Sequence, residues 1–344
     1  MASTVPQPTL SFPRETFAKL SPHPYLLAHL QPTSSDSTPT RANGRSPTQF
    51  RTAHVNNGSL THAEGSAVVR IGDTTVVCGI RAEILLASNA AGYRVDKAVT
   101  APSSRDGYNE AKELDLLVPN IELATGCSPA FLPGQPPSTL AQSLSTRVYT
   151  LLHSSGLVDP EDLRIWYQPP DLRDPDEMED EEPDAVEPEV KGFWTLYIDI
   201  LFISLDGNPF DAAWAAVVSA LNNVRLPKAS WDPDRQMIIC DDSVVESKNL
   251  QLRGMPLAVT ALVFKSKEQA RGGEKKYWIL VDPDTFEEGL CDESVTVVVD
   301  CSSSTTKVLS ISKSGGTIVG REEMREIVDL AATRWIDLSQ LLKG

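Results

Sequence analysis

The pattern of apolar and polar residues places a buried strand and a buried helix at the middle of the chain. Residues 194–205 are almost continuously apolar and rich in Ile, Leu, Phe and Tyr, which is typical of a buried strand. Four turn-forming residues follow at 206–209. From Asp211 the residues become mostly Ala, Val and Trp at helical spacing, and Pro227 is predicted to end this helix. Such a pair indicates the centre of a layered α/β or α+β core.

Strands dominate the chain before this centre, with one helix among them. Alternating apolar residues interrupted at Gly72-Asp73 predict a β-hairpin. The predicted strands are residues 51–55, 67–71, 74–80, 116–123 and 163–167. A helix is predicted between its cap, Ser138, and Gly156, which ends it. Its inward-facing residues are predicted to be Leu140, Leu144, Val148, Leu151 and Leu152. Residues 88–114 are polar and predict a long loop.

After Pro227 the pattern again predicts mostly strands. These strands are residues 237–240, 257–265, 277–281, 294–300 and 307–312. The last helix is predicted over residues 322–342. Its apolar face comprises Met324, Ile327, Val328, Ala331, Trp335, Leu338 and Leu342.

Two segments differ in composition from the rest. Residues 1–42 are rich in Pro, Ser and Thr and are predicted to be an arm and linker, within which residues 17–30 could form a short amphipathic helix or a docked arm. Residues 43–344 are predicted to be one domain with an acidic insertion at 171–190. Between Asp171 and Glu189 there are eleven acidic residues and one basic residue, a charge of −10 out of the total of −16. The remaining −6 does not exclude an RNA partner with a local binding site.

Cysteine, histidine and hydropathy patterns exclude several classes of protein. The five cysteines are scattered and form no CxxC pair, which argues for a reducing compartment and against a zinc site or a disulfide framework. The five histidines show no metal-binding spacing. No run approaches the roughly 20 apolar residues of a membrane span, and the N-terminal residues do not resemble a secretory signal. The sequence therefore predicts no metal, no cofactor and no membrane.

The segment DPDTFEEGLCD, residues 282–292, is the best acidic constellation in the chain. Carboxylates at the end of a strand can hold Mg²⁺ or act as general acid or base in phosphoryl chemistry. The alternative is an acidic hairpin loop without chemistry, which the spacing taken alone favours.

Four groups of residues, taken together, resemble the RNase PH family. They are Asn43-Gly44-Arg45, which is close to the family's PDGR; Gly65-Ser66-Ala67 with residues 72–76; DLLVPNIELATGCSP from Asp115; and residues 206–227 with the later LVDPDTFEE. They keep the order that they have in the family. The resemblance runs from about residue 43 to the C-terminus, apart from the acidic insertion, and is closest to the RNase PH-like ring subunits of the eukaryotic RNA exosome.

The resemblance implies a fold, partners and a chemistry. The fold would be the RNase PH-like α+β fold (ribosomal protein S5 domain 2-like), with mixed sheets packed on central helices. Six such subunits form a hexameric ring around a pore for RNA, together with RNA-binding cap subunits and associated exoribonucleases. The location would be the nucleus, including the nucleolus, and the cytoplasm. Active members of the family perform phosphorolysis, in which inorganic phosphate attacks the 3′-terminal linkage of RNA and releases a nucleoside diphosphate.

This sequence departs from what the resemblance implies for an active member. Active members have clustered arginines in the helix that matches residues 138–152, where this chain has Arg147 alone. They also have two aspartates six residues apart in the loop that matches residues 282–292. Asp292 matches the second aspartate, but Phe286 stands at the position of the first, and a one-residue gap would bring Glu287 there instead. The motifs therefore predict no catalytic residues, with Glu287 and Asp292 as remnants of an active site.

Three hypotheses follow for the function. The first is a non-catalytic ring subunit of the RNA exosome that supports 3′→5′ RNA processing and decay, including rRNA maturation and mRNA decay, and lines the RNA path. Its candidate RNA-contacting residues are Arg94, Lys97, Arg105 and Arg147. The second is an active phosphate-dependent exoribonuclease that uses Arg147, Asp292 and Glu287. The third is an unrelated interaction protein that binds its partner through the acidic insertion.

Overall fold

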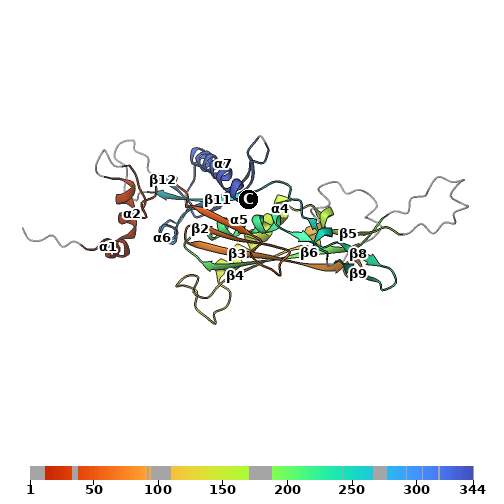
Figure 1. Cartoon of the computed structure of the whole chain (residues 1–344). Coiled ribbons are helices and arrows are strands. Elements are labelled where there is room, and N and C mark those ends of the chain that lie inside the picture. The colour runs from red at the N-terminus through yellow and green to blue at the C-terminus, as the bar shows by residue number, and fades with distance from the viewer. Residues whose placement is uncertain are drawn as a thin grey trace, which may run out of the picture.

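Two β-sheets with helices packed between and against them make up the architecture of the computed structural model (Figure 1). The structure describes residues 12–32, 38–90, 93, 110–169, 188–241, 243–265, 277–291, 293–303, 305–316 and 318–343. The helices are α1 (Arg14–Leu20), α2 (Pro22–Leu30), α4 (Thr139–Ser155), α5 (Pro209–Asn222), α6 (Thr285–Glu288) and α7 (Arg321–Lys343). None of the described helices is long and apolar enough to cross a membrane.

The larger sheet has six strands and mixed topology. Its strands are β1 (Ala53–Asn57), β2 (Gly65–Ile71), β3 (Thr74–Leu86), β4 (Leu117–Leu123), β5 (Arg164–Tyr167) and β6 (Glu189–Ser204). The order is β1-β2-β3-β6-β4, with β5 also paired to β6. All pairs are antiparallel except β4 with β6. The antiparallel pairing of β5 with β6 places the acidic insertion, whose residues 170–187 lie outside the described part, in the connection of a hairpin.

The smaller sheet is antiparallel and contains four strands. These are β11 (Leu257–Lys265), β12 (Tyr277–Val281), β13 (Ser294–Asp300) and β14 (Lys307–Ser314), in the order β12-β11-β13-β14. Two short ribbons complete the described strands: β7 (Arg225–Leu226) with β10 (Lys248–Asn249), and β8 (Ala229–Asp232) with β9 (Met237–Cys240). The mixed sheet, the antiparallel sheet and the packed helices confirm the predicted α+β class.

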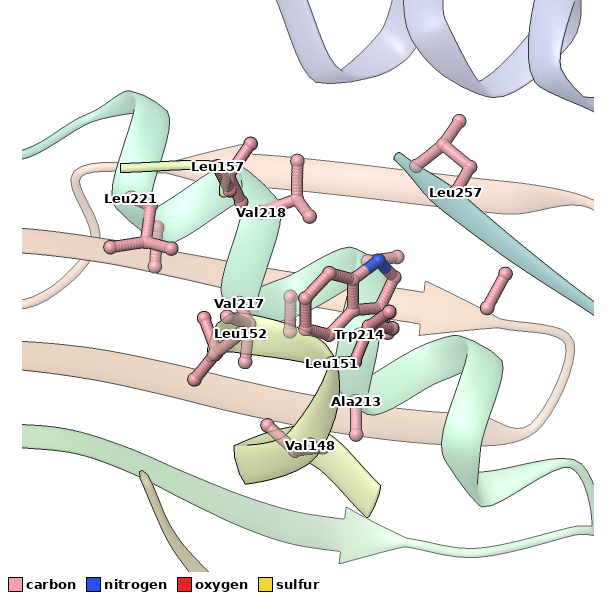
Figure 2. Packing of buried hydrophobic residues seen from close by; sticks show 14 of the residues in the cluster. Val148, Leu151, Leu152, Leu157, Ala213, Trp214, Val217, Val218, Leu221 and Leu257 are labelled. Carbon is pink, nitrogen blue, oxygen red and sulfur yellow. The ribbon is translucent and has the colours of Figure 1, made fainter. Parts of the chain in front are cut away.

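Helix α5 lies in the middle of the core, in contact with strands of both sheets. Every residue from Pro209 to Leu221 is buried, as the mainly apolar composition predicts for a helix surrounded by other elements. Figure 2 shows Trp214 among side chains from α4, α5 and β11. Its indole Nε1 donates a 2.9 Å hydrogen bond to the carbonyl oxygen of Pro256, so the buried polar atom of this large side chain is satisfied.

The predicted boundaries of helix α4 are confirmed, but one residue that was predicted to face the core does not do so. The Ser138 hydroxyl accepts a hydrogen bond from the backbone N–H of Ala141, and Gly156 ends the helix in the left-handed conformation. Leu140 does not face the core as predicted, because it is 37% exposed in the first turn, and Ala141 is buried instead.

The predicted end of α5 is also wrong. The helix ends at Asn222, because the chain turns at Asn223 and then enters strand β7, which pairs with β10. Pro227 therefore follows a strand and not a helix. The short strands β7, β8 and β10 were not predicted, and residues 110–113 are helical within the predicted long loop. Strand β3 continues to Leu86, beyond its predicted end at residue 80, and β6 begins at Glu189, before its predicted start at residue 194. The other predicted strands and the last helix are present with small differences at their ends.

The N-terminal segment packs on the smaller sheet. Leu26 and Leu30 of α2 are fully buried against Leu262, Phe264 and Leu280, whereas α1 buries no residue. Figure 1 shows α1 and α2 at the opposite end of the molecule from the β8-β9 ribbon. The apolar residues of the predicted arm are thus helical, and α2 is docked.

A close approach of β2 to α5 gives a test of the core. A β-carbon at Gly65 would lie 2.6 Å from the carbonyl oxygen of Ala220 and 2.5 Å from a methyl group of Val224, distances that force the backbone to shift. We expect Gly65→Ala to lower the free energy of unfolding by about 1–3 kcal/mol, the usual cost of overpacking a core. Urea denaturation measures this change. Gly316→Ala is the matched control, because no atom lies within 4 Å of the added carbon there.

Candidate functional site

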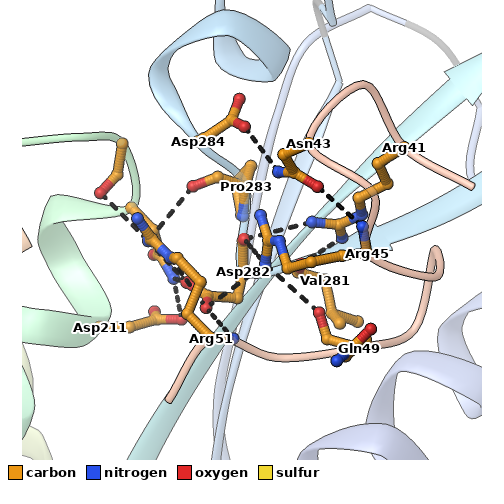
Figure 3. Close-up of polar contacts among 12 residues, drawn as sticks. Arg41, Asn43, Arg45, Gln49, Arg51, Asp211, Val281, Asp282, Pro283 and Asp284 are labelled. Carbon is orange, nitrogen blue, oxygen red and sulfur yellow. Dashed lines mark hydrogen bonds and ion pairs between the residues drawn. The ribbon is translucent and has the colours of Figure 1, made fainter. Parts of the chain in front are cut away.

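The loop after β12 meets the N-terminal segment and the start of α5 at a buried carboxylate (Figure 3). Asp282 is 2% exposed and has a left-handed backbone with φ of 48°. Its Oδ2 accepts hydrogen bonds from the backbone N–H and the Nε of Arg51, at 2.8 and 3.0 Å. Its Oδ1 accepts from Nη2 of Arg51 at 2.8 Å and from Nδ2 of Asn208 at 2.9 Å. Asp282 therefore joins three segments that are far apart in sequence.

These contacts fix the charge of Asp282. Burial acts to raise the pKa of this carboxyl, but the hydrogen bonds and charge of Arg51, together with Asn208, outweigh it and hold the pKa at about 2. The carboxylate is therefore ionised at neutral pH, and all its strong hydrogen bonds are made within the protein.

A second group of residues lies on the other side of the same loop. The side chain of Arg41 is fully buried and donates to the carbonyl oxygens of Pro47 and Val281 and, at 3.2 Å, to Oε2 of Glu287. Glu287 also closes a capping box at the start of α6, where Asp284 is the N-cap. Glu287 is thus committed to structural contacts with Arg41 and the backbone of Asp284.

A chain of hydrogen bonds continues from Asn208 through the core. Nδ2 of Asn208 also donates to Asp211, whose two carboxylate oxygens accept from the backbone N–H and the hydroxyl of Thr260, both at 2.7 Å. The Thr260 hydroxyl lies 2.9 Å from that of Thr296, which accepts from Nη2 of Arg147 at 3.0 Å. Arg147 is thereby positioned by the core, at the end of a network that begins at Asp282.

Arg147 lies in a cleft between α4, the start of α5 and the smaller sheet. The cleft has a volume of about 450 Å³. Its lining is mainly apolar side chains and hydroxyls and includes Ser128, Phe131, Leu140, Ser143, Leu144, Leu205, Phe210, Leu262, Ser294 and Ser314. The guanidinium carbon of Arg147 lies 3.9 Å from the centre of the Phe210 ring, a cation–π contact.

The charges of this cleft limit what it can bind. Among its described lining residues, Arg147 is the single cation and Glu288 the single carboxylate. Although part of the Glu288 side chain reaches solvent, its carboxylate accepts a 2.8 Å hydrogen bond from the backbone N–H of Asn208, and burial raises its pKa to about 7. One arginine, offset in part by a carboxyl group that is only partly ionised at neutral pH, gives a weak site for a phosphate dianion, which strong sites bind with several positive groups.

Of the predicted site residues that the structure describes, only some lie at the cleft. Arg147 lines the cleft, whereas Glu287 lies buried beside Arg41 and does not line it. Phe286 packs its ring against Tyr25 of α2. The remaining predicted residues lie outside the described part of the chain: Arg94, Lys97, Arg105 and Asp292. The described residues contain no cluster of three or more His, Cys, Asp or Glu that could hold a metal ion.

Sequence reasoning missed most of the polar network. It had singled out the loop at residues 282–292 and the Asn43-Gly44-Arg45 motif, but not Arg41, Arg51 or Asp211. A usable signal was present: Asp211 is an acid within an otherwise apolar helix, and a buried acid needs partners. No local spacing indicates which partner each acid takes.

Comparison with known proteins identifies the family. The description "3′ exoribonuclease family" fits two parts of the chain, domain 1 over residues 49–227 and domain 2 over residues 254–334. The chain is also 31% identical over 326 residues to the exosome complex component rrp43 of Schizosaccharomyces pombe, a match that covers 95% of this chain and 97% of that protein. The chain belongs to the 3′ exoribonuclease family. The third hypothesis, an unrelated interaction protein, is therefore wrong.

Other members of the 3′ exoribonuclease family agree with this assignment. The exosome complex component Rrp42 of Archaeoglobus fulgidus is 26% identical over 291 residues, covering 85% of this chain and 86% of that protein. A solved structure described as the Archaeoglobus fulgidus exosome with RNA bound to the active site matches with a TM-score of 0.60 at 25% identity, covering 92% of this chain and 96% of that chain. The motifs had predicted a likeness to the exosome subunit called ribosomal RNA-processing protein 43, and the match to rrp43 confirms it.

Replacement of Asp282 tests the network. We expect Asp282→Asn to lower the free energy of unfolding at neutral pH by about 3–5 kcal/mol, because it removes the closest and most buried counter-charge of the Arg51 guanidinium and leaves only the more distant, exposed Asp206 as an ion-pair partner. The pKa of Asp282 is lowered from 3.8 to about 2, so its ionised form stabilises the fold above about pH 4. That stabilisation is lost as pH falls from about 4 through about 2, and the difference between the proteins should narrow there.

The control is the same substitution at an exposed aspartate that also forms an ion pair with an arginine. Asp73→Asn removes a surface ion pair with Arg70 and should change stability by no more than about 1 kcal/mol. Denaturant titrations of the three proteins at several pH values supply the comparison. Equal losses for the two variants at neutral pH would contradict the role given to Asp282.

Proposed function

We propose that this chain is a non-catalytic subunit of an exosome ring built from RNase PH-like proteins. It would support 3′→5′ processing and degradation of RNA without cutting RNA itself. The observation that carries the proposal is the cleft at Arg147, which has a single cation among its described lining residues. The nearby acids Asp211, Asp282 and Glu287 are occupied by hydrogen bonds inside the protein. A phosphate would find one guanidinium, already in contact with Phe210 and Thr296.

The relatives support the assembly part of the proposal. Exosome components from a fungus and from an archaeon match nearly the whole chain, so the described core is the one that those proteins use. We propose as partners other RNase PH-like subunits in a hexameric ring, RNA-binding cap subunits, associated exoribonucleases and RNA. We propose the nucleus, including the nucleolus, and the cytoplasm as its location. Arg94, Lys97 and Arg105 remain candidate contacts to RNA phosphates.

An activity assay separates this proposal from the phosphorolytic alternative. The purified chain, incubated with single-stranded RNA, Mg²⁺ and inorganic phosphate, should release no nucleoside diphosphate above background. Asp292→Asn should leave this result unchanged. Phosphate-dependent release of nucleoside diphosphates that Asp292→Asn abolishes would establish the active-enzyme hypothesis instead.

The composition of the native complex tests the assembly. We expect the chain, tagged and purified from its source cells, to occur as one copy among several different RNase PH-like subunits and RNA-binding partners. Native mass spectrometry gives the copy number and the subunit identities. A ring built only of this chain would count against the proposal and revive the active-enzyme hypothesis.

A further inference from the structure

The edge of the smaller sheet at β14 is open along its length. Strand β14 pairs with β13 on one side and, within the described residues, with nothing on the other. Its backbone N–H and C=O groups on that side therefore have no protein partner among the described residues. Such an edge is a template for another strand, and natural proteins usually protect it.

The other ends of the two main sheets carry such protection. Strand β12 is covered at Val281, whose backbone N–H donates to Pro47 and whose carbonyl accepts from Arg41. Strand β4 contains Pro119 and Glu122, and β1 ends in two asparagines. Proline, charge and polar side chains are the usual means of discouraging strand pairing.

Strand β14 instead exposes apolar side chains at its centre. Val308, Leu309 and Ile311 are 40–50% exposed, although Val297 and Val299 on the adjacent strand are fully buried. Lys307 and Lys313 lie near the two ends of the strand, and the strand has no acidic residue. Lys313 already forms a 3.1 Å ion pair with Glu293 on the neighbouring loop. An open edge with exposed Val, Leu and Ile is suited to a partner strand that covers these side chains.

We propose that β14 is a subunit interface, which binds an edge strand of a different RNase PH-like subunit and extends the smaller sheet across the boundary. This inference rests on the proposed ring function. The pairing satisfies the open backbone groups and buries the exposed apolar side chains. The partner strand carries Asp or Glu at the position that faces Lys307, because opposite charges across a strand pair are favourable and like charges are not.

The charge of the chain argues against a second copy as the partner. In a self-paired ribbon, the antiparallel register centred on Ser310 would set Lys307 of each copy directly opposite Lys313 of the other, so that two lysines would share one nearby carboxylate, that of Glu293. Each copy also carries a net charge of −16, which opposes self-association over longer distances. The open edge therefore selects a different chain.

Two substitutions of the same residue type test the interface. Ile311→Asp places a negative charge on the open edge, and Ile203→Asp places one on the outer face of β6, at 50% and 53% exposure respectively. In complexes purified from source cells through a tag on the full chain, we expect Ile311→Asp to reduce at least one co-purifying RNase PH-like subunit about tenfold. Ile203→Asp should leave its amount unchanged.

A photo-crosslinking residue at Ser310 supplies a second readout in a chain with native Ile311. The expected product joins Ser310 to an edge strand of another RNase PH-like subunit, identified by mass spectrometry. A crosslink to a second copy of this chain, to RNA or to a protein without this fold would overturn the inference. So would equal retention, or equal loss, of partners by the two aspartate variants.

Co-purification with the unsubstituted chain shows whether a negative result counts against the β14 interface alone or also against the ring function. If that chain co-purifies with RNase PH-like subunits but Ile311→Asp keeps all of them, the ring proposal stands and the β14 interface is wrong. If the unsubstituted chain brings down no such subunit, both are wrong.

Discussion

The carboxylate of Asp282 is the constraint on which the arrangement of the site depends. An ionised group with almost no exposure is tolerated only where its partners are fixed, because loss of one partner leaves an uncompensated buried charge. Its partners are Arg51, which precedes the first strand, and Asn208, the N-cap of α5. In the segment that follows Asp282, Glu287 forms an ion pair with Arg41. The N-terminal segment, the central helix and the smaller sheet are therefore held in one geometry.

Under the proposed function, this network shows how a site can keep its architecture while its chemistry changes. Glu287, which the motifs give as a remnant of a catalytic site, serves in the structure to cap α6 and to bind Arg41. At the far end of the network Arg147 is held by Thr296 and the Phe210 ring, so its position is kept even where no second cation joins it among the described lining residues.

Much of the fold could be predicted from the sequence, because its central elements have simple patterns. Strand β6 has a long apolar centre, helix α5 is apolar at most of its positions, and α7 has a clear apolar face, so burial determines each of them. The end of α5 could not be predicted from Pro227, since a turn at Asn223 and a two-residue strand come first. Leu140 follows the helical period but lies in the first turn, beside an open cleft.

The site was predicted only in part, for a different reason. Arg51 and Asp282 are 231 residues apart, and neither lies in a pattern that indicates the other. Pairing between distant charged residues depends on the finished fold, and the same acidic loop was compatible with a metal site, a catalytic site or a hairpin. The family motifs predicted that a site lies near residues 282–292. They did not predict which side chains contact one another there.

The position of α5 between the two sheets also bears on how the chain folds. The family descriptions divide the sequence into two parts, and α5 belongs to the first, yet it packs against β11 in the second. Both sheets pack against this one helix, the larger through β2 and β3 and the smaller through β11, and Asp211 of the helix binds Thr260 of the second part. The packing around α5 therefore cannot be completed until β11 of the second part has been synthesised.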